Sequence, residues 1–461
     1  MRSTPDIYAL PVSDNWMLVS PHSSTTAMVN RAGVEALAAY AEDDGADVPM
    51  PLIDLWCKLC EPSATALPAP AEPEKLVIIP TRACNMQCVY CDFGRPGASA
   101  QTLDPGLACK LIDATVARLT SMSHAMLRIH FFGGEPLSAR RCIETVVHYA
   151  RMVCARKALT PWFEITTNGL FDSTAIPFIG DYIDNVVVSL DGPEAFHDFT
   201  RRRKSGAGTY AAIAANIRQL SRFPVELSVR TCITNRSVEA IADIASHLCS
   251  EFEFDVLCFE MLAPNEESHD AGLSPPDPDR FAAGVLEAEA LAAAHGVRVV
   301  HSQSELTSPR TTSCPVGRGT LMLNPDGRLT ACYLETERWT ERGIDPVLGR
   351  VDPVSGPMIE PEKSATILQL VQSKPRCARC FCRHTCAGGC HIEQTPPGCS
   401  LEYDDRCRAT RIITAGRMLR NLEGAAAADA FAGQSSVMRR VAENPDDRLT
   451  AWSAEPKRAH P

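Results

Sequence analysis

The chain has 461 residues, of which 45% are hydrophobic and 22% are charged, and this length suits about three domains. The composition is typical of a globular protein and excludes a disordered or collagen-like chain. Asp and Glu outnumber Lys and Arg by 56 to 45, and the net charge of -11 disfavours binding to nucleic acid or to an anionic membrane. There is no run of about 18 or more apolar residues and no secretory signal. We therefore expect a cytoplasmic protein that binds neither nucleic acid nor membrane.

The 20 cysteines are many for a reducing compartment, where disulfides are rare. Several of them lie in two close groups, Cys84 to Cys91 and Cys314 to Cys407. In a cytoplasmic protein such spacing indicates metal ligands. The histidines show no HxxxH or HExxH arrangement, so a second type of metal site is not indicated.

Residues 1–60 predict a small N-terminal α+β unit. The runs IYALPV and NWMLVSP are typical of strands, and a helical pattern, NRAGVEALAAYAE, begins at Asn30. Residues 61–74 then mix Pro, Ala and Glu without periodicity. This composition predicts an extended linker and a domain boundary.

Residues 75–304 alternate short β-branched or aromatic runs with longer helical patterns. The runs are LVIIP, LRIHFF, WFEITT, VVVSL, VELSVRTCIT, FDVLCFEML and VRVVHS. This alternation predicts an α/β fold in which parallel βα units form a partial (β/α)6 barrel of the TIM type. In such barrels the chemistry lies at the C-terminal ends of the strands. Four motifs follow strand ends here: Cys84 to Cys91, Gly133 to Glu135, Thr167 to Gly169 and Ser189 to Gly192.

The C-terminal third has a different character. Residues 305–410 show little periodicity, frequent Gly and Pro, and nine cysteines, so we expect bound metal to replace a hydrophobic core there. Residues 411–461 predict one more helix, followed by a mobile tail from about Gly433.

The first cysteine group places three thiolates on one loop directly after a strand. Cys84, Cys88 and Cys91 form the pattern CX3CXΦC. A [4Fe–4S] cluster normally takes four cysteines, so three ligands leave one iron open to an outside ligand. A structural zinc site needs four N or S ligands, and this loop offers no second pair nearby. The pattern therefore favours a cluster with an open, reactive iron.

With the segments that follow it, this loop resembles the radical S-adenosylmethionine (radical SAM) superfamily, which carries CX3CXΦC after the first strand of a partial (β/α)6 barrel. The resemblance covers residues 75–410. It implies that the amino and carboxylate groups of SAM chelate the open iron. It also implies that one electron cleaves the sulfonium to give a 5′-deoxyadenosyl radical.

The resemblance implies roles for individual residues as well. Gly133, Gly134 and Glu135 match the family's GGE motif, whose backbone and carboxylate hold the methionyl ammonium of SAM. The positions that match contacts to the ribose and methionyl groups are Thr167, Asn168, Ser189 and Asp191. Tyr90 is expected near the adenine. One arginine of Arg201, Arg202 and Arg203 is expected to meet the SAM carboxylate, and the pattern does not say which.

The second cysteine group resembles the seven-cysteine SPASM extension of this superfamily, CX9–15GX4C…CX2CX5CX3C…C. Its members here are Cys314, Cys332, Cys377, Cys380, Cys386, Cys390 and Cys407. The resemblance implies two auxiliary Fe–S clusters, both expected to be [4Fe–4S], and a peptide or protein substrate. A zinc ribbon is the alternative that the CxxC pair alone would favour.

Carried over by position, the ligands of the outer auxiliary cluster would be Cys377, Cys380, Cys386 and Cys407, and those of the inner cluster Cys314, Cys332 and Cys390. The inner set is one short, because Thr320 stands where many members have a cysteine. Its fourth ligand could be Cys382, Cys399, a water or the substrate itself. Cys399 also competes with Cys407 for the last outer position.

Anaerobic sulfatase-maturating enzymes share this architecture, but one residue argues against that activity. They place an acidic general base directly after the cysteine of GX4C, where this chain has Tyr333. A tyrosine with an ordinary pKa near 10 is a poor base at neutral pH, although it can relay protons or electrons, or simply pack. The nearest acid is Glu335. Tyr333 and Glu335 are thus the candidate catalytic residues.

The N-terminal unit resembles leader-peptide recognition elements, which add a strand of a precursor to an exposed sheet edge. We therefore predict a radical SAM/SPASM maturase that installs a crosslink or other oxidative modification on a ribosomally synthesised peptide. Its expected partners are the precursor peptide and an electron donor such as flavodoxin or ferredoxin. The alternatives are formylglycine formation on a sulfatase, a small-molecule substrate, and a non-catalytic Fe–S or zinc protein.

The other cysteines are expected to pack. Cys57 and Cys60 favour buried thiols over a redox pair, because no thioredoxin-like context surrounds them. The cysteines expected as small core residues are Cys109, Cys142, Cys154, Cys232, Cys249 and Cys258.

Overall fold

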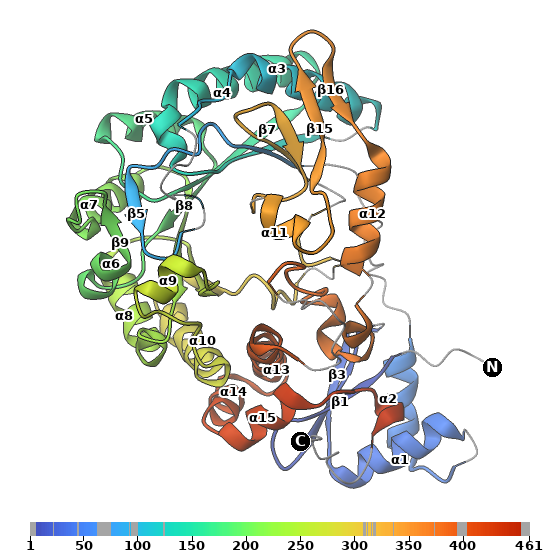
Figure 1. Ribbon diagram of the computed structural model, residues 1–461. Helices are drawn as coiled ribbons and strands as arrows, with labels where there is room; N and C mark the ends of the chain where they lie inside the picture. The colour runs from blue at the N-terminus through green and yellow to red at the C-terminus, as the bar shows by residue number, and fades with distance from the viewer. Residues whose placement is uncertain are drawn as a thin grey trace.

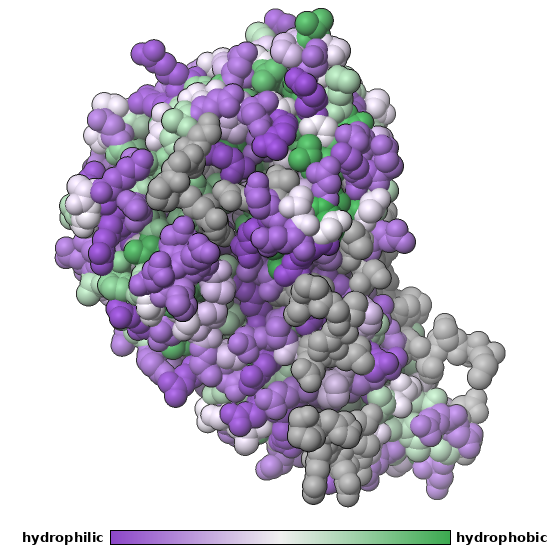
Figure 2. Space-filling model, viewed as in Figure 1, coloured by the Kyte–Doolittle hydropathy of each residue, from purple (hydrophilic) through white to green (hydrophobic). Residues whose placement is uncertain are grey.

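The computed structural model describes residues 6–21, 23–43, 46–61, 75–91, 93, 100–122, 125–307, 310, 312–314, 316, 320–334, 336–372, 374–393 and 403–452. Figure 1 shows an arc of helices around a curved sheet, with the N-terminal unit beside the C-terminal helices. Among the described residues, no helix is long and apolar enough to cross a membrane. Hydrophilic side chains dominate the face seen in Figure 2.

The barrel is built from parallel strands with helices on their outer face. The strands, in sheet order, are β12 (Arg298–Val300), β11 (Val256–Met261), β10 (Glu226–Ile233), β8 (Asn185–Ser189), β7 (Thr160–Thr167), β6 (Met126–Phe131) and β4 (Lys75–Ile78). The helices are α3 (Pro105–Ser121), α4 (Arg140–Arg156), α5 (Ile176–Tyr182), α6 (Glu194–Thr200), α7 (Tyr210–Leu220), α8 (Ile241–Glu251) and α10 (Pro278–Ala293). This arrangement confirms the predicted α/β fold with a partial barrel.

Alternation along each strand separates the core from the lumen. On β10, Leu227, Val229 and Ile233 are buried in the hydrophobic core, while Arg230 and Cys232 at the alternate positions are only half-buried. The helices present a matching stripe. On α4 the buried residues recur at three- and four-residue spacing: Cys142, Ile143, Val146, Val147, Ala150 and Cys154.

The cysteine-rich region continues the barrel sheet, which the sequence did not predict. β13 (Thr320–Leu323) pairs in parallel with β4, and β14 (Arg328–Thr330), β15 (Val347–Asp352) and β16 (Gly356–Ile359) follow antiparallel. Leu323 and Leu329 of these strands are fully buried. The expectation that metal replaces a hydrophobic core here was therefore wrong for this part of the region. The other elements are β5 (Met86–Cys88), β9 (Arg201–Arg203), α9 (Glu266–Asp270), α11 (Thr336–Thr340) and α12 (Pro361–Gln372).

The N-terminal unit is a small antiparallel sheet packed on two helices. Its order is β1 (Tyr8–Pro11), β2 (Trp16–Ser20), β3 (Thr25–Val29), with α1 (Arg31–Glu42) and α2 (Met50–Cys60) behind them. The Asn30 side chain caps α1 by accepting a hydrogen bond from the Gly33 N–H, as its position before the helical pattern predicts. β3 and α2 were not predicted. Cys57 on α2 is exposed, which contradicts the buried-thiol interpretation for that residue.

The C-terminal residues differ from the expected helix and tail. α13 (Asp405–Glu423) is followed by α14 (Ala425–Ala432) and α15 (Ser435–Glu443), which pack against the barrel. Val437, Met438 and Val441 are buried, because they form one apolar stripe along α15. Short 3₁₀ helices complete the connections: Pro136–Ala139, Ser173–Ala175, Val238–Ala240, Pro375–Arg379, Phe381–His384 and Leu449–Ala451.

Candidate active site

The first cysteine loop lies at the C-terminal edge of the barrel. Its middle forms β5, which pairs antiparallel with β9, so that Cys88 lies opposite Arg201. Cys84, Cys88 and Cys91 are all half-buried. Burial is the main reason that the pKa of the Cys84 and Cys88 thiols is raised, and the neighbouring thiols add to this effect. The structure thus brings the three predicted thiols together.

These thiols fit a cluster better than a single ion. Within the described part of the chain, no three His, Cys, Asp or Glu side chains converge on one metal-ion position, whereas the thiolates of a cubane each bind a different iron. The Met86 N–H and the Asn168 side-chain amide donate to Cys84 Sγ at 3.4 and 3.5 Å. Burial raises the pKa of Cys88 to about 12, and the nearby Arg201 guanidinium acts in the opposite direction.

The GGE segment fits against the cysteine loop through its glycines. A Cβ at Gly134 would lie 2.3 Å from the carbonyl oxygen of Ala83, and Gly133 has a φ of +142°. The neighbouring Glu135 N–H donates to the Ala83 carbonyl at 2.9 Å. Only residues without a side chain allow the two backbones this approach.

Glu135 is buried and engaged by protein donors. Its carboxylate accepts hydrogen bonds from the Leu137 N–H at 3.0 Å, the Thr167 hydroxyl at 2.8 Å and the Asn168 N–H at 2.8 Å. Burial raises its pKa to about 7, against the effect of these bonds. In this structure Glu135 therefore fixes the end of β7, and through it Asn168, whose side chain in turn reaches Cys84.

Asp191 is the centre of a second buried network. Its carboxylate accepts from the Tyr90 hydroxyl at 2.5 Å, the Thr200 hydroxyl at 2.7 Å and the Cys232 N–H at 3.1 Å, and it pairs with Arg201 at 3.1 Å. Burial acts to raise the pKa of Asp191, but Arg201 and the hydrogen bonds hold it below its usual range. Asp191 remains ionised and joins the cysteine loop to the ends of β8 and β10.

Of the three neighbouring arginines, Arg201 is the one at the site. Its guanidinium lies 5.3 Å from the centre of the Tyr90 ring, besides its ion pair with Asp191. Arg202 instead stacks on Phe199 and donates to the Asp198 carbonyl. Of the three arginines that the sequence left open, Arg201 is therefore the one that contacts the predicted site residues Asp191 and Tyr90.

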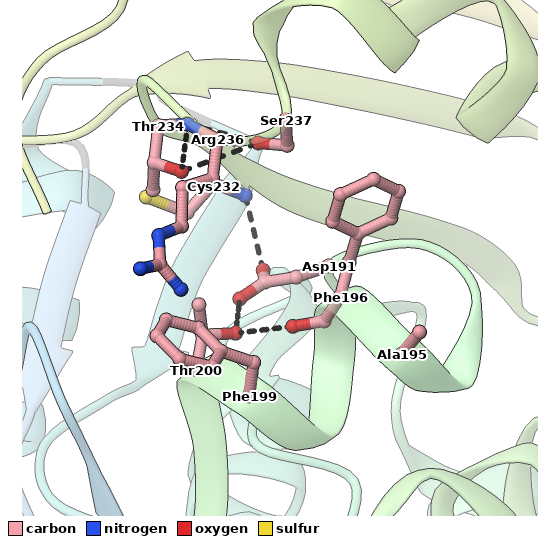
Figure 3. Close-up of a pocket in the computed structure, with 9 residues that line it drawn as sticks. All are labelled: Asp191, Ala195, Phe196, Phe199, Thr200, Cys232, Thr234, Arg236 and Ser237. Carbon is pink, nitrogen blue, oxygen red and sulfur yellow. Dashed lines mark hydrogen bonds between the residues drawn. The ribbon is translucent and has the colours of Figure 1, made fainter.

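A cavity of about 220 Å³ opens beside this network. Figure 3 shows Asp191 hydrogen-bonded to Thr200 and to the Cys232 backbone along one side, with aromatic rings from α6 on the other. The lining residues are Asp191, Ala195, Phe196, Phe199, Thr200, Cys232, Thr234, Arg236 and Ser237. The sequence interpretation placed Cys232 in the core and assigned no role to Phe199 or Thr234. The end of the run VELSVRTCIT was a signal for Cys232 and Thr234, since site residues follow barrel strands; no sequence signal pointed to Phe199.

The cysteines of the C-terminal region separate into two sets. Burial raises the pKa of Cys332 to about 12, and Cys314 and Cys390 contribute to the shift, so these three lie together. A second cavity is lined by Cys377, Cys380, Cys382, Cys386 and Cys407. Cys382 therefore lies with the outer set, which argues against it as fourth ligand of the inner set. Cys399 lies outside the described residues.

Comparisons with known proteins bear on this geometry. Residues 78–248 match the sequence model of the radical SAM superfamily. This segment of the chain belongs to the superfamily. A cysteine-type anaerobic sulfatase-maturating enzyme of Clostridium perfringens is 21% identical over 357 residues, which cover 73% of this chain and 94% of that enzyme. A serine-type anaerobic sulfatase-maturating enzyme of Klebsiella aerogenes is 22% identical over 323 residues, covering 67% of this chain and 77% of that enzyme.

A solved structure supports the same fold. The enzyme anSMEcpe, with bound AdoMet and a peptide, gives a TM-score of 0.61 at 19% identity, and the match covers 77% of this chain and 99% of that chain. At this identity the likeness is one of fold. The superfamily membership makes the chain an enzyme, so the non-catalytic alternative is set aside.

The lumen of the radical SAM barrel is polar and charged. Glu164 pairs with Lys75 at 3.1 Å and with His130 at 3.3 Å. Burial lowers the pKa of His130 to about 4, so His130 is neutral near pH 7. Arg230 of β10 and Glu260 of β11 lie further along the same face. These residues were not predicted, because strand alternation shows which face they share but not that the face is a lumen.

Tyr333 belongs to this lumen. Its side chain is 39% exposed, and its ring lies 5.0 Å from Phe132 and 6.0 Å from Phe93. Burial raises its pKa above the usual value, so Tyr333 is neutral and does not act as a base. Cys258 is also half-buried on the lumen face, 3.6 Å from Glu260, which contradicts the core role expected for it. Glu335 lies outside the described residues.

Proposed function

We propose that this enzyme is a radical SAM/SPASM maturase that modifies a ribosomally synthesised peptide oxidatively, by a crosslink or a related change. The observation that carries the proposal is the N-terminal sheet. Its outer strand has an edge to which a precursor peptide can pair, and the same chain carries a radical SAM barrel. The barrel is related to enzymes whose solved structures include a bound peptide.

The free edge is that of β3. The opposite edge of the sheet is covered, because the Ala9 N–H donates to the Asp447 carbonyl at 2.8 Å and the Leu449 N–H to the Ile7 carbonyl at 2.7 Å. Within the described residues, β3 pairs only with β2. An extended leader segment of the precursor can therefore pair with residues 25–29 through backbone hydrogen bonds.

The residues of the first site suit SAM and its cluster. Cys84, Cys88 and Cys91 would hold the [4Fe–4S] cluster, which supplies the electron for reductive cleavage of SAM. Phe199 and Thr234 line a cavity whose aromatic and polar walls suit the adenosine part of SAM. Arg201 is the cation placed to meet the SAM carboxylate.

Two auxiliary clusters complete the proposal. Cys377, Cys380, Cys386 and Cys407 would bind the outer cluster, and Cys314, Cys332 and Cys390 the inner one, with Cys399, a water or the substrate as its fourth ligand. A cluster beside the lumen can accept the electron that an oxidative modification leaves behind. A reduced flavodoxin or ferredoxin would supply the electron to the cluster held by Cys84, Cys88 and Cys91.

Sulfatase maturation is the second candidate, because the curated relatives that align over most of the chain have that activity. Tyr333 is the observation against it, since a tyrosine stands where those enzymes have an acidic general base, and a phenol with an ordinary pKa near 10 is a poor base at neutral pH. Glu164 is an acid within the same lumen, but Lys75 and His130 already engage it.

The test uses anaerobically reconstituted full-length enzyme. We expect about 12 iron atoms per chain for three clusters and SAM-dependent formation of 5′-deoxyadenosine that Cys84→Ala abolishes. Short peptides encoded beside the gene are then co-expressed with the enzyme and analysed by mass spectrometry for loss of hydrogen. Binding of the modified precursor should protect the amides of residues 25–29 from hydrogen exchange. Formylglycine on a sulfatase-derived peptide, with no change in any neighbouring peptide, would establish the second candidate instead.

A further inference from the structure

Arg230 occupies the middle of the lumen. It lies on β10 two residues before Cys232, whose N–H donates to Asp191 of the first site. Its other near neighbours are Tyr333, which follows the inner-set Cys332, and Glu260 of β11. Arg230 thus has neighbours from the SAM site and from the segment that carries the inner cysteine Cys332.

The guanidinium of Arg230 has no partner of its own. Among the described residues it makes no hydrogen bond and no ion pair, whereas Arg201 is paired with Asp191 at 3.1 Å. The carboxylate of Glu260 is engaged by Ser302 and by the Cys258 thiol instead. The donors of this half-buried guanidinium are therefore available to a group that enters the lumen.

A second arginine shares the carboxylate that faces Arg230. Burial acts to raise the pKa of Glu260, but His301, Arg230 and Arg406 hold it below its usual range, so Glu260 is an anion. Arg406, which donates to the Met261 carbonyl at 3.0 Å, is a second cation beside the same carboxylate. Two guanidinium groups therefore face one carboxylate.

We propose that Arg230 binds a carboxylate of the peptide substrate and so selects an acidic group at or beside the residue that is modified. The inference rests on the proposed peptide substrate. A guanidinium and a carboxylate match in shape and can form two parallel hydrogen bonds. Tyr333 and Phe132 form an aromatic wall nearby, and limited access of water strengthens such a pair. The carboxylate comes from an Asp or Glu side chain or from the C-terminus of the peptide.

The test measures binding of short acetylated alanine peptides to reconstituted full-length enzyme with SAM, by titration calorimetry. One probe has a central Asp and an amidated end, a second has Asn in its place, and a third has only a free C-terminal carboxylate. We expect the Asp probe, or the free-carboxylate probe if the C-terminus is the source, to bind at least about tenfold more tightly than the Asn probe. Arg230→Gln should remove this preference, and Arg230→Lys should keep part of it.

Arg298→Gln is the matched control, since Arg298 is exposed and pairs with Glu226 on the outside of the lumen region; it should leave the preference intact. Equal binding of all three probes to the wild type, or binding of none, overturns the inference without any variant. Failure of the proposed function is a separate result, because it would appear as absence of 5′-deoxyadenosine from the wild type. Iron content and circular dichroism identify a variant that has misfolded. In that case the binding of the three probes to the wild-type enzyme decides whether the inference holds.

Discussion

Gly134→Ala tests how closely the GGE segment must approach the cysteine loop. The added Cβ would lie 2.3 Å from the Ala83 carbonyl oxygen and 2.4 Å from that of Arg82, where ordinary contact begins at about 3.4 Å. The two backbones must therefore separate by about 1 Å. Because both obstacles are backbone atoms, no side-chain rotation can relieve the clash. Overpacking of this kind costs about 1–3 kcal/mol.

The shift displaces the loop that carries Cys84. A misplacement of about 1 Å at a reacting centre lowers the rate about a hundredfold, so 5′-deoxyadenosine formation by Gly134→Ala should fall by about that factor. The assay is anaerobic, with iron content and thermal midpoint measured alongside. Gly433→Ala is the control, because its Cβ would meet nothing closer than 3.6 Å. If Gly134→Ala kept wild-type iron content and rate, the close approach would have no functional meaning.

Three further predictions concern buried charges. Asp191→Asn leaves Arg201 without its anion, and breaking a buried pair costs about 3–5 kcal/mol, so calorimetry should show a lower thermal midpoint and SAM titration weaker binding. Arg411→Met leaves Asp447 buried and unpaired, with a similar cost, and Asp447→Asn in the same chain should recover part of the midpoint. Burial raises the pKa of Glu135 to about 7 from an ordinary 4.5. The folded chain therefore keeps a proton that the unfolded chain loses as pH rises from 4.5 to 7, so stability falls across that window; Glu135→Gln should reduce this slope, and an unchanged slope would contradict the assignment.

The sequence predicted best where local pattern and function coincide. The βα alternation predicted the barrel, and the strand-end rule led to Glu135 and Asp191, which the structure places in two buried networks. What it could not predict was their partners. Both carboxylates are engaged by protein donors from other strand ends, and these contacts depend on strand order and register rather than on neighbouring residues. Which of Arg201, Arg202 and Arg203 lies at the site likewise depends on a contact between distant segments, the pairing of β9 with β5.

The spacing of cysteines showed that ligands were present but not how they divide. CX2CXC places Cys377, Cys380 and Cys382 within six residues, and sequence alone allowed Cys382 to serve the inner set. The short 3₁₀ helices Pro375–Arg379 and Phe381–His384 turn the chain back on itself. Cys382 therefore faces the cavity of the outer set.

The mobile tail expected from about Gly433 is wrong for residues 433–452, for a reason that connects three distant parts of the chain; residues 453–461 lie outside the described residues. Arg411 of α13 is buried, donates to Cys380 Sγ at 3.2 Å and pairs with Asp447 at 2.7 Å. The backbone of Asp447 in turn accepts from Ala9 of β1 at 2.8 Å. No local signal marks Asp447, because its role comes from partners 36 and 438 residues away in the sequence. A buried guanidinium needs that anion, so the C-terminal segment is held between the outer cysteines and the N-terminal sheet.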